Sequence, residues 1–545
     1  MTGAKPIKII PLGGIGEIGK NMTAIEYDGD IIVIDAGIAF PTEDTPGIDL
    51  IIPDYKYLVI NRDKVRAFIV THGHEDHIGA MPFVLKDVQA PVYGTKLTIA
   101  FIEHKLKEHK LDTKCLKTIR DGDIIKLGRF TVEFVKVSHS VSGSVAIAIT
   151  TPQGVIFHSG DFKIDFTPID NDAVNLQKIA QIGAQGVLLM LCESTNIERE
   201  GFSLSESSVG GEFDRIFTEN TSRRIIVATF SSNIHRLQQI FDAAVKHNRK
   251  VVLSGKSIIK NTEIAARIHE LKYQDGLIID IDAMNRYNDD RLVIIGTGSQ
   301  GEPMSALTRM ASGDYPKVKI SANDTVIISA TSIPGNEKAV NNVINNLYKR
   351  GANVIYEALA DVHVSGHACK EELKIIHSLI KPKFFMPVHG EYRHLKQHLN
   401  LAVSLGMPYA NVIIPSIGDV VEVTKKSILI RESVPSGTLY IDGITVGVTD
   451  KDILSDRRKL SGDGIIILLT DLENKSSEVI ARGLMIDESF TEELKALVNN
   501  ITDNFTYDGI DDRAELKIVL KRAVKKQVWK KLNKAPMILP LIMDD

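Results

Sequence analysis

The sequence predicts an α/β protein in which a β-sandwich flanked by helices is interrupted by a doubly wound parallel unit. Residues 7 to about 200 show short β runs separated by turns. Residues from about 206 to 365 alternate strand and helix patterns instead, which is typical of a parallel sheet. A third observation is that a set of histidines and aspartates in the first segment is completed by His389, beyond the second segment. The second segment is therefore interpreted as an insertion into the sandwich.

Hydrophobic periodicity places the elements of these two segments. In the first segment, strands are predicted at 23–27, 31–34, 130–137 and 154–160, and helices at 97–109 and 173–182. In the second segment, strands at 224–228, 250–253, 325–329 and 352–356 alternate with helices at 234–247 and 337–350.

A third segment, of small α+β type, begins after about residue 430. It contains a predicted strand at 464–469 and predicted helices at 491–504 and 512–534. The last helix has the apolar stripe Leu516, Leu520, Val524 and Val528, and its basic side chains are Arg513, Lys517, Lys521, Arg522, Lys525, Lys526, Lys530, Lys531 and Lys534. Because runs of charge usually face water, a solvated face on a docked helix is favoured over contact with a nucleic acid such as RNA. These changes of pattern divide the chain into 1–205 and 366–445 (the two parts of the sandwich domain, the second with a linker), 206–365 (the insertion) and 446–545 (the C-terminal domain).

Composition narrows the class of protein. A chain of 545 residues is long for one domain, and its 43% hydrophobic and 25% charged residues are ordinary for a globular protein. No apolar run approaches the length of a membrane span and Met1–Leu12 lacks the form of a signal peptide, so we expect a cytoplasmic protein without a membrane partner. Cys115, Cys192 and Cys369 are far apart, which argues against a disulfide framework. The net charge of −4 means that any nucleic-acid binding must use local basic patches.

The most informative stretch is Thr71-His72-Gly73-His74-Glu75-Asp76-His77, directly after an apolar run. Polar loops at strand ends are where open α/β folds place their chemistry. Imidazole and carboxylate ligands without thiolate suit Zn²⁺ or Mn²⁺, and these groups are too many for one catalytic ion with open positions. A polar loop with surface histidines is the weaker interpretation, because crowded cationic side chains repel one another. The spacing therefore predicts two adjacent metal ions.

Three further residues of ligand type each follow a predicted strand. His139 follows 130–137, Asp161 follows 154–160 and His389 follows 384–388. Each of these residues alone would more often be a loop residue without function. Together with the histidine cluster, they form a coherent set of ligands for two metal ions.

This constellation resembles the metallo-β-lactamase superfamily, whose H-x-H-x-D-H motif is present as His72, His74, Asp76 and His77. The resemblance implies two metal positions, one held by His72, His74 and His139 and the other by Asp76, His77 and His389. It also implies that Asp161 bridges them. Asp35 matches the first motif of the superfamily, an acid that orients a ligand histidine. An aspartate that only turns the chain after a strand is an equally good interpretation.

Two glycine motifs resemble phosphate-binding loops. The segment Gly14–Gly19 satisfies G-x-G-x-x-G, but a strand-like pattern follows it, and no helix N-terminus is available for a pyrophosphate. We interpret it as a loop that lets the backbone approach the metal site. The segment Gly296–Gly301 precedes a predicted helix from Met304. A tight turn that lends backbone N–H groups to a substrate phosphate is favoured there over a nucleotide cofactor.

An α/β insertion before the last metal ligand resembles the β-CASP branch of the superfamily, whose members are nucleases. Three further motifs of this branch match Glu193, His367 and His389, with Glu193 where aspartate is commoner. Within the branch the resemblance narrows to the ribonuclease J family and covers almost the whole chain, including 12–21, 229–236, 298–304 and 536–540. Every implied metal ligand is present, which favours a catalytically active member.

The resemblance implies a metal-dependent phosphodiester hydrolase that acts on single-stranded RNA as a 5′-to-3′ exonuclease and an endonuclease, in RNA maturation, rRNA processing and mRNA decay. Two Zn²⁺ are the implied cofactors, with Mn²⁺ or Mg²⁺ as alternatives. A Ca²⁺ site would map onto Asp49 and Asp442, where two ordinary loop aspartates are as good an interpretation. The implied partners are RNA, preferably with a 5′-monophosphate, and further subunits in a homodimer or homotetramer, with a paralogous subunit as an alternative.

The resemblance also implies catalytic and substrate-binding residues. Asp76, Glu193 and His367 are the predicted catalytic residues, with His367 protonating or stabilising the leaving oxygen and Glu193 orienting it. A histidine that caps a helix from Glu371 is the alternative for His367. Hydroxyl, amide and backbone N–H groups are suitable phosphate donors. The pocket for the terminal phosphate and base maps onto Ser232, Asn233, His363, Val364, Ser365, Gly366 and His367.

Two other functions compete with a nuclease. A small-molecule metallo-hydrolase would not need the insertion or the loop 365–367. A non-catalytic or weakly active subunit of an RNA-decay complex would be expected to lack at least one metal ligand, and none is missing from the sequence.

Overall fold

The structure, a computed structural model of the chain, describes residues 5–42, 44–300, 302, 305–331, 336–443, 445–447, 451–474, 476–505 and 511–543. The chain divides into two compact units, Met1–Ala39 with Ile52–Thr438 and Phe40–Ile51 with Leu439–Asp545. No helix in the described part of the chain is both long and apolar enough to cross a membrane.

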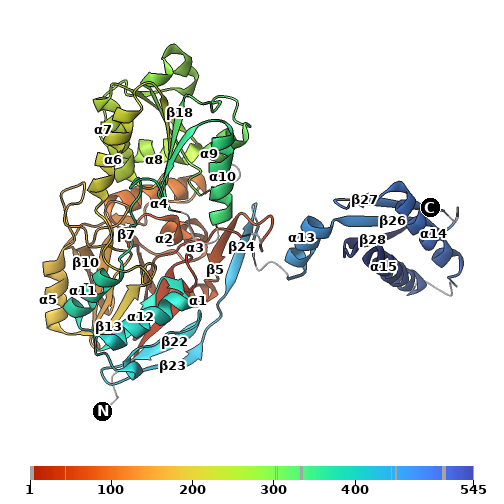
Figure 1. The fold of residues 1–545 in the computed structure, drawn as a ribbon. Helices are drawn as coiled ribbons and strands as arrows, with labels where there is room; N and C mark the ends of the chain where they lie inside the picture. The colour runs from red at the N-terminus through yellow and green to blue at the C-terminus, as the bar shows by residue number, and fades with distance from the viewer. Residues whose placement is uncertain are drawn as a thin grey trace. The chain divides into compact units, whose positions relative to one another are not determined.

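Two β-sheets form the sandwich of the first unit (Figure 1). The strands of one sheet lie in the order β23-β22-β1-β3-β4-β6-β7-β8, and those of the other in the order β20-β13-β12-β11-β10-β9. The first sheet consists of β1 (Ile7–Gly13), β3 (Met22–Tyr27), β4 (Asp30–Ile34), β6 (Val65–Ile69), β7 (Val92–Gly94), β8 (Leu116–Thr118), β22 (Asp419–Val423) and β23 (Ile428–Ser433). The second sheet consists of β9 (Ile124–Leu127), β10 (Phe130–Lys136), β11 (Val145–Thr151), β12 (Gly154–His158), β13 (Val187–Glu193) and β20 (Phe384–Val388).

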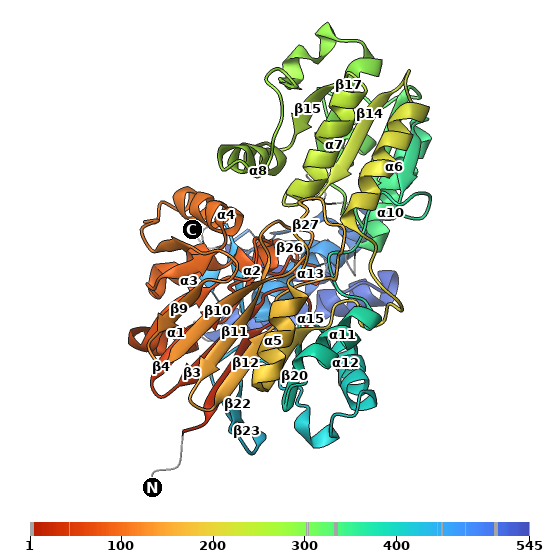
Figure 2. The ribbon, with the colours of Figure 1, turned by 90° about the vertical axis from the view of Figure 1, so that its left-hand side faces the viewer.

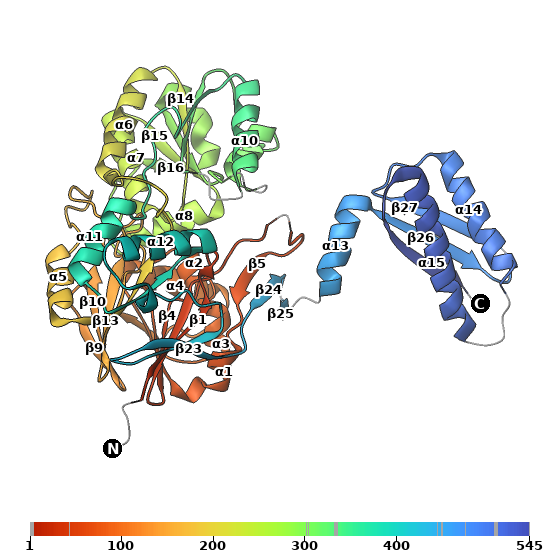
Figure 3. The same ribbon diagram turned by 60° about the horizontal axis from the view of Figure 1, so that its bottom comes forward.

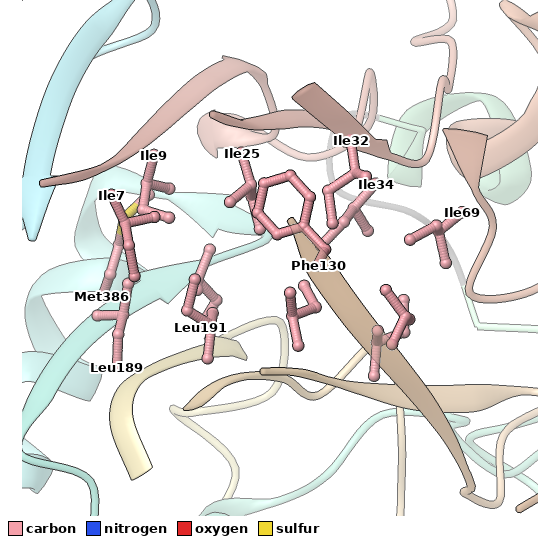
Figure 4. Close-up of a cluster of buried hydrophobic side chains, with 14 of the residues drawn as sticks. Ile7, Ile9, Ile25, Ile32, Ile34, Ile69, Phe130, Leu189, Leu191 and Met386 are labelled. Atoms are coloured by element: carbon pink, nitrogen blue, oxygen red, sulfur yellow. The ribbon is translucent and has the colours of Figure 1, made fainter. Parts of the chain in front are cut away.

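The facing surfaces of the two sheets share one apolar core (Figure 4). Ile25, Ile32 and Ile34 of the first sheet pack with Phe130 and Leu191 of the second, and each is at most 1% exposed. Burying an apolar side chain of this size contributes roughly 1.5–3 kcal/mol relative to leaving it in water. Because a one-residue slip would turn these side chains out of the core, the core also fixes the register of the strands that carry the polar loops.

Helices cover the outer faces of the sandwich. On one side, α5 (Leu176–Gln185), α11 (Lys370–Ile380) and α12 (Tyr392–Ser404) share a second apolar cluster with β12, β13 and β20. The other side carries α1 (Lys56–Ile60), α2 (Glu75–Ile78), α3 (Met81–Asp87) and α4 (Lys96–Glu108). Figure 2 shows the sheets between these two groups of helices. The predicted αββα arrangement is confirmed.

Between β13 and β20 the chain forms a separate parallel sheet in the order β16-β15-β17-β14-β18-β19. Its strands are β14 (Arg224–Thr229), β15 (Lys250–Ser254), β16 (Ile278–Ile279), β17 (Leu292–Gly296), β18 (Asp324–Ser329) and β19 (Asn353–Tyr356). Its helices are α6 (Glu206–Glu219), α7 (Ile234–Lys246), α8 (Lys256–Arg267), α9 (Ala306–Ser312) and α10 (Glu337–Lys349). Figure 1 shows α6 and α7 on one side of the sheet and α9 and α10 on the other. The sandwich resumes where β20 pairs in parallel with β13, so the predicted insertion is confirmed.

The second unit has its own sheets and core. The strands β5 (Leu50–Pro53), β24 (Thr438–Asp442) and β25 (Thr445–Gly447) form a small sheet. After α13 (Lys451–Asp463), the strands β26 (Ile465–Asp471), β27 (Ser476–Arg482) and β28 (Met537–Met543) form another, in the order β27-β26-β28. The helices α14 (Glu488–Asp503) and α15 (Asp511–Leu532) pack on this second sheet (Figure 3). Leu520 and Val524 of α15 are completely buried there, which confirms the predicted apolar stripe.

Most predicted elements form, and the differences lie mainly at their ends. The helix predicted at 173–182 begins at Leu176, because Asn175 caps it by accepting a hydrogen bond from the Lys178 N–H at 3.0 Å. The helix predicted at 491–504 begins at Glu488, where Asp487 accepts from the Phe490 N–H at 2.7 Å. The helix predicted from Met304 begins at Ala306 in the described residues. The sequence patterns did not predict α13 or β27, which contain few apolar residues.

Candidate metal centre

The predicted metal ligands lie on loops at the carboxyl ends of strands from both sheets. His72, His74 and His77 follow β6, Asp161 follows β12 and His389 follows β20. The strands β12, β13 and β20 run parallel, as do β4 and β6. Their carboxyl ends therefore meet at the same edge of each sheet, and the apolar core between the sheets holds the two edges together.

The first cluster consists of His72, His74 and His139. The Nδ1 atom of His74 lies 3.0 Å from His72 Nε2 and 3.1 Å from His139 Nε2. All three ligand atoms lie within 4.8 Å of one another. The structure thus brings together the three residues that the sequence assigns to one metal ion.

The second cluster consists of Asp76, His77, Asp161 and His389. The Oδ2 atom of Asp161 lies 3.1 Å from His77 Nε2 and 3.7 Å from His389 Nε2, and Asp76 Oδ2 lies 3.2 Å from His389 Nε2. The same Asp161 oxygen is 3.7 Å from His72 Nε2 in the first cluster. Asp161 therefore lies between the clusters, where a bridging ligand has to be.

The donor set fits metal ions. Ligand atoms about 2.0–2.1 Å from a tetrahedral Zn²⁺ lie about 3.4 Å from one another, and the separations in both clusters are close to this value. The second nitrogen of each imidazole is also held in place, as is usual for metal-binding histidines. His77 Nδ1 donates to Asp35 at 2.7 Å, His139 Nδ1 donates to the Gly366 carbonyl at 2.7 Å, and His389 Nδ1 lies 2.6 Å from Thr195 Oγ1.

Asp35 has both of the roles considered from the sequence, because it orients a ligand-type histidine and turns the chain after a strand. Its carboxylate orients His77 and also accepts from the Thr71 N–H at 2.8 Å, which fixes the start of the histidine loop. Its backbone also turns the chain after β4, with φ at +59°. The loop at Gly14 approaches the centre as expected, since the Gly14 carbonyl accepts from the His389 N–H at 2.9 Å and β3 follows without a helix.

Burial and neighbouring charges shift the pKa values of the side chains in the centre in directions that favour cation binding. Burial lowers the pKa of His72 and of His139 well below the usual value, so these imidazoles are neutral and can act as ligands. Burial alone would raise the pKa of Asp161, but the nearby His389 and His77 hold that pKa well below the usual range. The carboxylates raise the pKa of His77 although burial opposes this. A metal ion bound there would take the place of the His77 proton.

Glu193 and His367 form a hydrogen-bonded pair beside the clusters. Glu193 ends β13, and its Oε2 lies 2.7 Å from His367 Nδ1 while its Oε1 accepts from the Phe162 N–H at 2.9 Å. Burial lowers the pKa of His367, but Glu193 and Asp161 outweigh it and raise the pKa to about 9. The N-cap position of α11 is occupied by Cys369, so His367 is not a helix cap.

The predicted phosphate pocket combines the loop 363–367 with the start of α7. Ser365 Oγ accepts from Asn196 Nδ2 at 2.7 Å and from the His367 N–H at 3.2 Å. Arg236, in the first turn of α7, donates to the Val362 carbonyl at 2.9 Å and so places the two segments side by side. Sequence reasoning missed Asn196, which lies three residues after Glu193, and Arg236, which ends the segment 229–236.

The remaining predicted pocket residues differ in their burial and in their hydrogen bonds. Asn233 is 2% exposed and caps α7 by accepting from the Arg236 N–H at 2.9 Å. Val364 is buried and offers only its backbone, whereas Ser232 is half-buried. His363 Nδ1 is buried without a hydrogen-bond partner among the described residues. Burial, together with Arg236, lowers the pKa of His363 to about 3.

The two aspartates of the predicted Ca²⁺ site are engaged by protein groups. Asp49 Oδ2 accepts from the Gly443 N–H at 2.7 Å, and Asp442 pairs with the Arg457 guanidinium. The guanidinium supplies the positive charge that Ca²⁺ would bring, so these contacts favour ordinary loop aspartates. A Ca²⁺ ion at this position stays an untested prediction.

The fold and the paired clusters define a metal-dependent hydrolase of the metallo-β-lactamase superfamily with a β-CASP insertion. Comparison of the sequence with known families agrees. Residues 15–187 match the metallo-beta-lactamase superfamily, and 351–415 match the Zn-dependent metallo-hydrolase RNA specificity domain. Residues 222–347 match the ribonuclease J beta-CASP domain, and 452–545 match the ribonuclease J C-terminal domain.

Similar proteins extend over the full chain. Ribonuclease J of Thermus thermophilus is 41% identical over 553 residues, which are 99% of this chain and 95% of the relative. Ribonuclease J of Synechocystis is 40% identical over 564 residues, which are 100% of this chain and 88% of the relative. The chain therefore belongs to the ribonuclease J family and is a metal-dependent ribonuclease. A solved structure of a protein of unknown function from Enterococcus faecalis V583 has the same fold, with a TM-score of 0.55 and 19% identity over 77% of this chain and all of that one.

Proposed function

We propose that this ribonuclease degrades single-stranded RNA from its 5′ end and also cuts it internally, in RNA maturation, rRNA processing and mRNA decay. The observation that carries the proposal is the contact of the loop 363–367 with the metal centre, where the Gly366 carbonyl accepts from His139 Nδ1 at 2.7 Å. A loop fixed in this way can hold an RNA terminus at a set distance from the scissile bond. An added Cβ at Gly366 would lie 2.7 Å from His139 Nδ1, so only glycine permits this approach.

Two Zn²⁺ ions are the proposed cofactors, with Mn²⁺ or Mg²⁺ as alternatives. One ion would be held by His72, His74 and His139, the other by Asp76, His77 and His389, with Asp161 shared. The five imidazoles favour Zn²⁺ over Mg²⁺, which prefers oxygen ligands. When bound, such a pair activates water and stabilises the entering and leaving oxygens at phosphorus.

Asp76, Glu193 and His367 are the proposed catalytic residues, and Asp76 and His367 lie on the solvent side of the centre. The side chains of Asp76 and His367 are 27% and 22% exposed, whereas that of Asp161 is 3% exposed, so RNA reaches the centre from the side of the first two. Because His367 Nδ1 is bound to Glu193, its Nε2 proton is the one available to the leaving O3′. The products would be a 5′-phosphate and a free 3′-OH.

The pocket formed by the loop 363–367 and the start of α7 is proposed to select a 5′-monophosphate. Hydroxyl, imidazole and backbone N–H groups can surround one phosphate closely, and the added bulk and charge of a triphosphate would not fit. Internal cleavage does not use this terminal contact.

A time course on one RNA with either a 5′-monophosphate or a 5′-triphosphate tests the proposal. We expect wild type to degrade the monophosphorylated RNA faster from the 5′ end, Ser365→Ala to reduce this preference, and His367→Ala to impair both modes of cleavage. Ser208→Ala on α6, a hydroxyl remote from the pocket in sequence, is the matched control. Equal rates on the two ends for wild type would exclude the pocket assignment, and cleavage undiminished by a chelator would exclude the metal assignment.

We also propose a homodimer or homotetramer, or an assembly with a paralogous subunit. The apolar side chains of Leu539, Leu541 and Met543 on β28 are 39–47% exposed, which supports a partner surface in the second unit. Membership of a ribonuclease family leaves no role for a small-molecule hydrolase. The complete set of ligands in the two clusters argues against a non-catalytic subunit.

A further inference from the structure

Helix α15 presents a cationic face, and most of its basic side chains form no ion pair within the described residues. No Asp or Glu occurs between Leu516 and Lys534, a stretch whose basic residues are Lys517, Lys521, Arg522, Lys525, Lys526, Lys530, Lys531 and Lys534. Two of them are paired, Lys531 with Glu493 at 2.6 Å and Lys534 with Asp463 at 2.9 Å. The other six form no ion pair within the part of the chain that the structure describes.

The only tryptophan of the chain, Trp529, lies on this face. Trp529 is 56% exposed and follows Ile518, Arg522 and Lys525 along one helical stripe with the spacing i, i+4, i+7, i+11. This stripe is opposite the buried stripe that begins with Leu516. The indole therefore contributes little to the core of the unit and stands among cations.

A solvated face accounts for the lysines, and the exposed indole among them adds an aromatic surface that such a face does not need. Unpaired cations around an exposed aromatic ring are how proteins bind single-stranded nucleic acid, because the cations contact phosphates and the ring stacks on a base. An anionic membrane surface would also be attracted to these cations. The face offers only Ile518 and Trp529 as exposed large apolar groups, however, which is too little for insertion into a bilayer.

We propose that this face binds the backbone of single-stranded RNA without sequence preference, with one base stacked on Trp529. The α15 face is defined by Lys517, Ile518, Lys521, Arg522, Lys525, Lys526, Trp529 and Lys530. The inference rests on RNA as the substrate and adds a contact that none of the metal-centre residues makes. Two contacts on one chain raise the effective concentration of a long RNA at the centre between successive cleavages. An RNA of a few nucleotides is shorter than two binding sites of about four or more nucleotides each, so it gains nothing from the second contact.

Intrinsic fluorescence tests the contact directly, because Trp529 is the only source of tryptophan emission. The probe is oligouridylate of about 20 nucleotides, which is one to several site sizes of typical single-strand binders. It is added to full-length Asp161→Ala protein, which prevents cleavage. We expect saturable quenching that weakens with salt. Lys521→Gln/Lys525→Gln should reduce the slope of log K against log salt by about 1.4, which is two phosphate contacts at about 0.7 each. Lys459→Gln/Lys495→Gln, which removes the same charge from α13 and α14, should leave the slope unchanged.

A cleavage assay tests the consequence. Trp529→Ala should raise KM about tenfold for a 5′-monophosphorylated RNA of about 40 nucleotides and leave KM unchanged for one of about five, and Trp529→Phe should restore wild-type behaviour. Absence of quenching by RNA, or equal effects on the long and short RNA, would overturn the inference. Emission that responds to phosphatidylserine vesicles and not to RNA would also overturn it. If RNA quenches Trp529 but wild type cleaves neither RNA, the RNA contact of the α15 face is supported and the proposed function is refuted.

Discussion

At the scale of single residues, Thr195 shows how much the centre depends on side chains that bind no metal. Its hydroxyl lies 2.6 Å from His389 Nδ1 and 3.3 Å from the His389 carbonyl. A hydroxyl that donates to the carbonyl must accept from Nδ1–H, so the lone pair of the neutral imidazole is on Nε2, which lies 3.2 Å from Asp76. Thr195 therefore selects the tautomer of His389 that can bind a cation.

Thr195→Val is expected to lower metal affinity and kcat/KM by about 10- to 100-fold, because the isosteric side chain cannot hold the tautomer. Thr195→Ser keeps the hydroxyl and should retain most of both quantities. Metal content after dialysis against graded chelator concentrations, measured with cleavage rates, checks this. Equal metal retention in the valine and serine variants would show that Thr195 has no such role.

Asp161 is the residue whose loss should affect both metal positions. Its Oδ2 atom lies 3.1 Å from His77 Nε2 and 3.7 Å from His72 Nε2, one in each cluster. Asp161→Ala should therefore abolish cleavage and lower bound metal by more than His74→Ala, which removes a ligand of one cluster only. Elemental analysis of the dialysed variants measures the difference. If the two variants lose the same amount of metal, Asp161 does not bridge.

The residues of the two clusters could be predicted from the sequence, as could Asp35, which holds His77, whereas the other groups that hold the histidines could not. H-x-H-x-D-H is contiguous, and each later ligand directly follows an apolar strand, so local pattern is enough. The His139–Gly366 hydrogen bond joins residues 227 positions apart, and the His389–Thr195 contact joins residues 194 positions apart. Such contacts depend on how the insertion and the two sheets pack, and periodicity carries no information about that.

At the scale of elements, Arg236 connects the helices of the insertion to the loop that carries His367. It is fully buried, forms an ion pair with Glu206 of α6 and donates to the Val362 carbonyl at 2.9 Å. The sequence predicted α7 within one residue of its observed ends, because its apolar period is strong. It gave no indication that a cation on this helix would be completely buried.

Arg236→Met is expected to lower the free energy of unfolding by about 3–5 kcal/mol, because it leaves the Glu206 carboxylate buried and unpaired. Arg236→Met/Glu206→Leu should recover part of this loss by removing the second charge as well. Urea unfolding of the two variants and wild type provides the comparison. A double variant less stable than the single one would mean that the attraction within the Arg236–Glu206 pair, and not the burial of an unpaired carboxylate, dominates the loss of stability.

At the scale of the whole molecule, the two units have separate apolar cores. The core between the sandwich sheets contains Ile25 and Phe130, and the core of the second unit contains Leu494 and Leu520. The change in the pattern of strands and helices after about residue 430 predicted the presence of a C-terminal domain. The sequence could not predict that β28 would pair in parallel with β26, because strands distant in sequence pair according to the fold and not to local pattern.

The last prediction concerns assembly, and it follows from the alternation along β28. Ile538 is 4% exposed within the core under α14 and α15, so Leu539 and Leu541 are 42% and 39% exposed on the opposite face. We expect truncation at about residue 450 to leave the metal content unchanged while it disrupts oligomers and weakens RNA cleavage.

Full-length Leu539→Ser/Leu541→Ser separates assembly from RNA contact, because it changes the open sheet face and leaves every residue of the α15 face in place. Light scattering should show smaller particles for this variant as for the truncated chain, whereas Trp529 should still be quenched by RNA. Chelator titration should give the metal content of wild type for both. A truncated chain with the wild-type particle size and full activity would show that subunits meet elsewhere. A double serine variant of wild-type size would place the interface of the second unit away from β28.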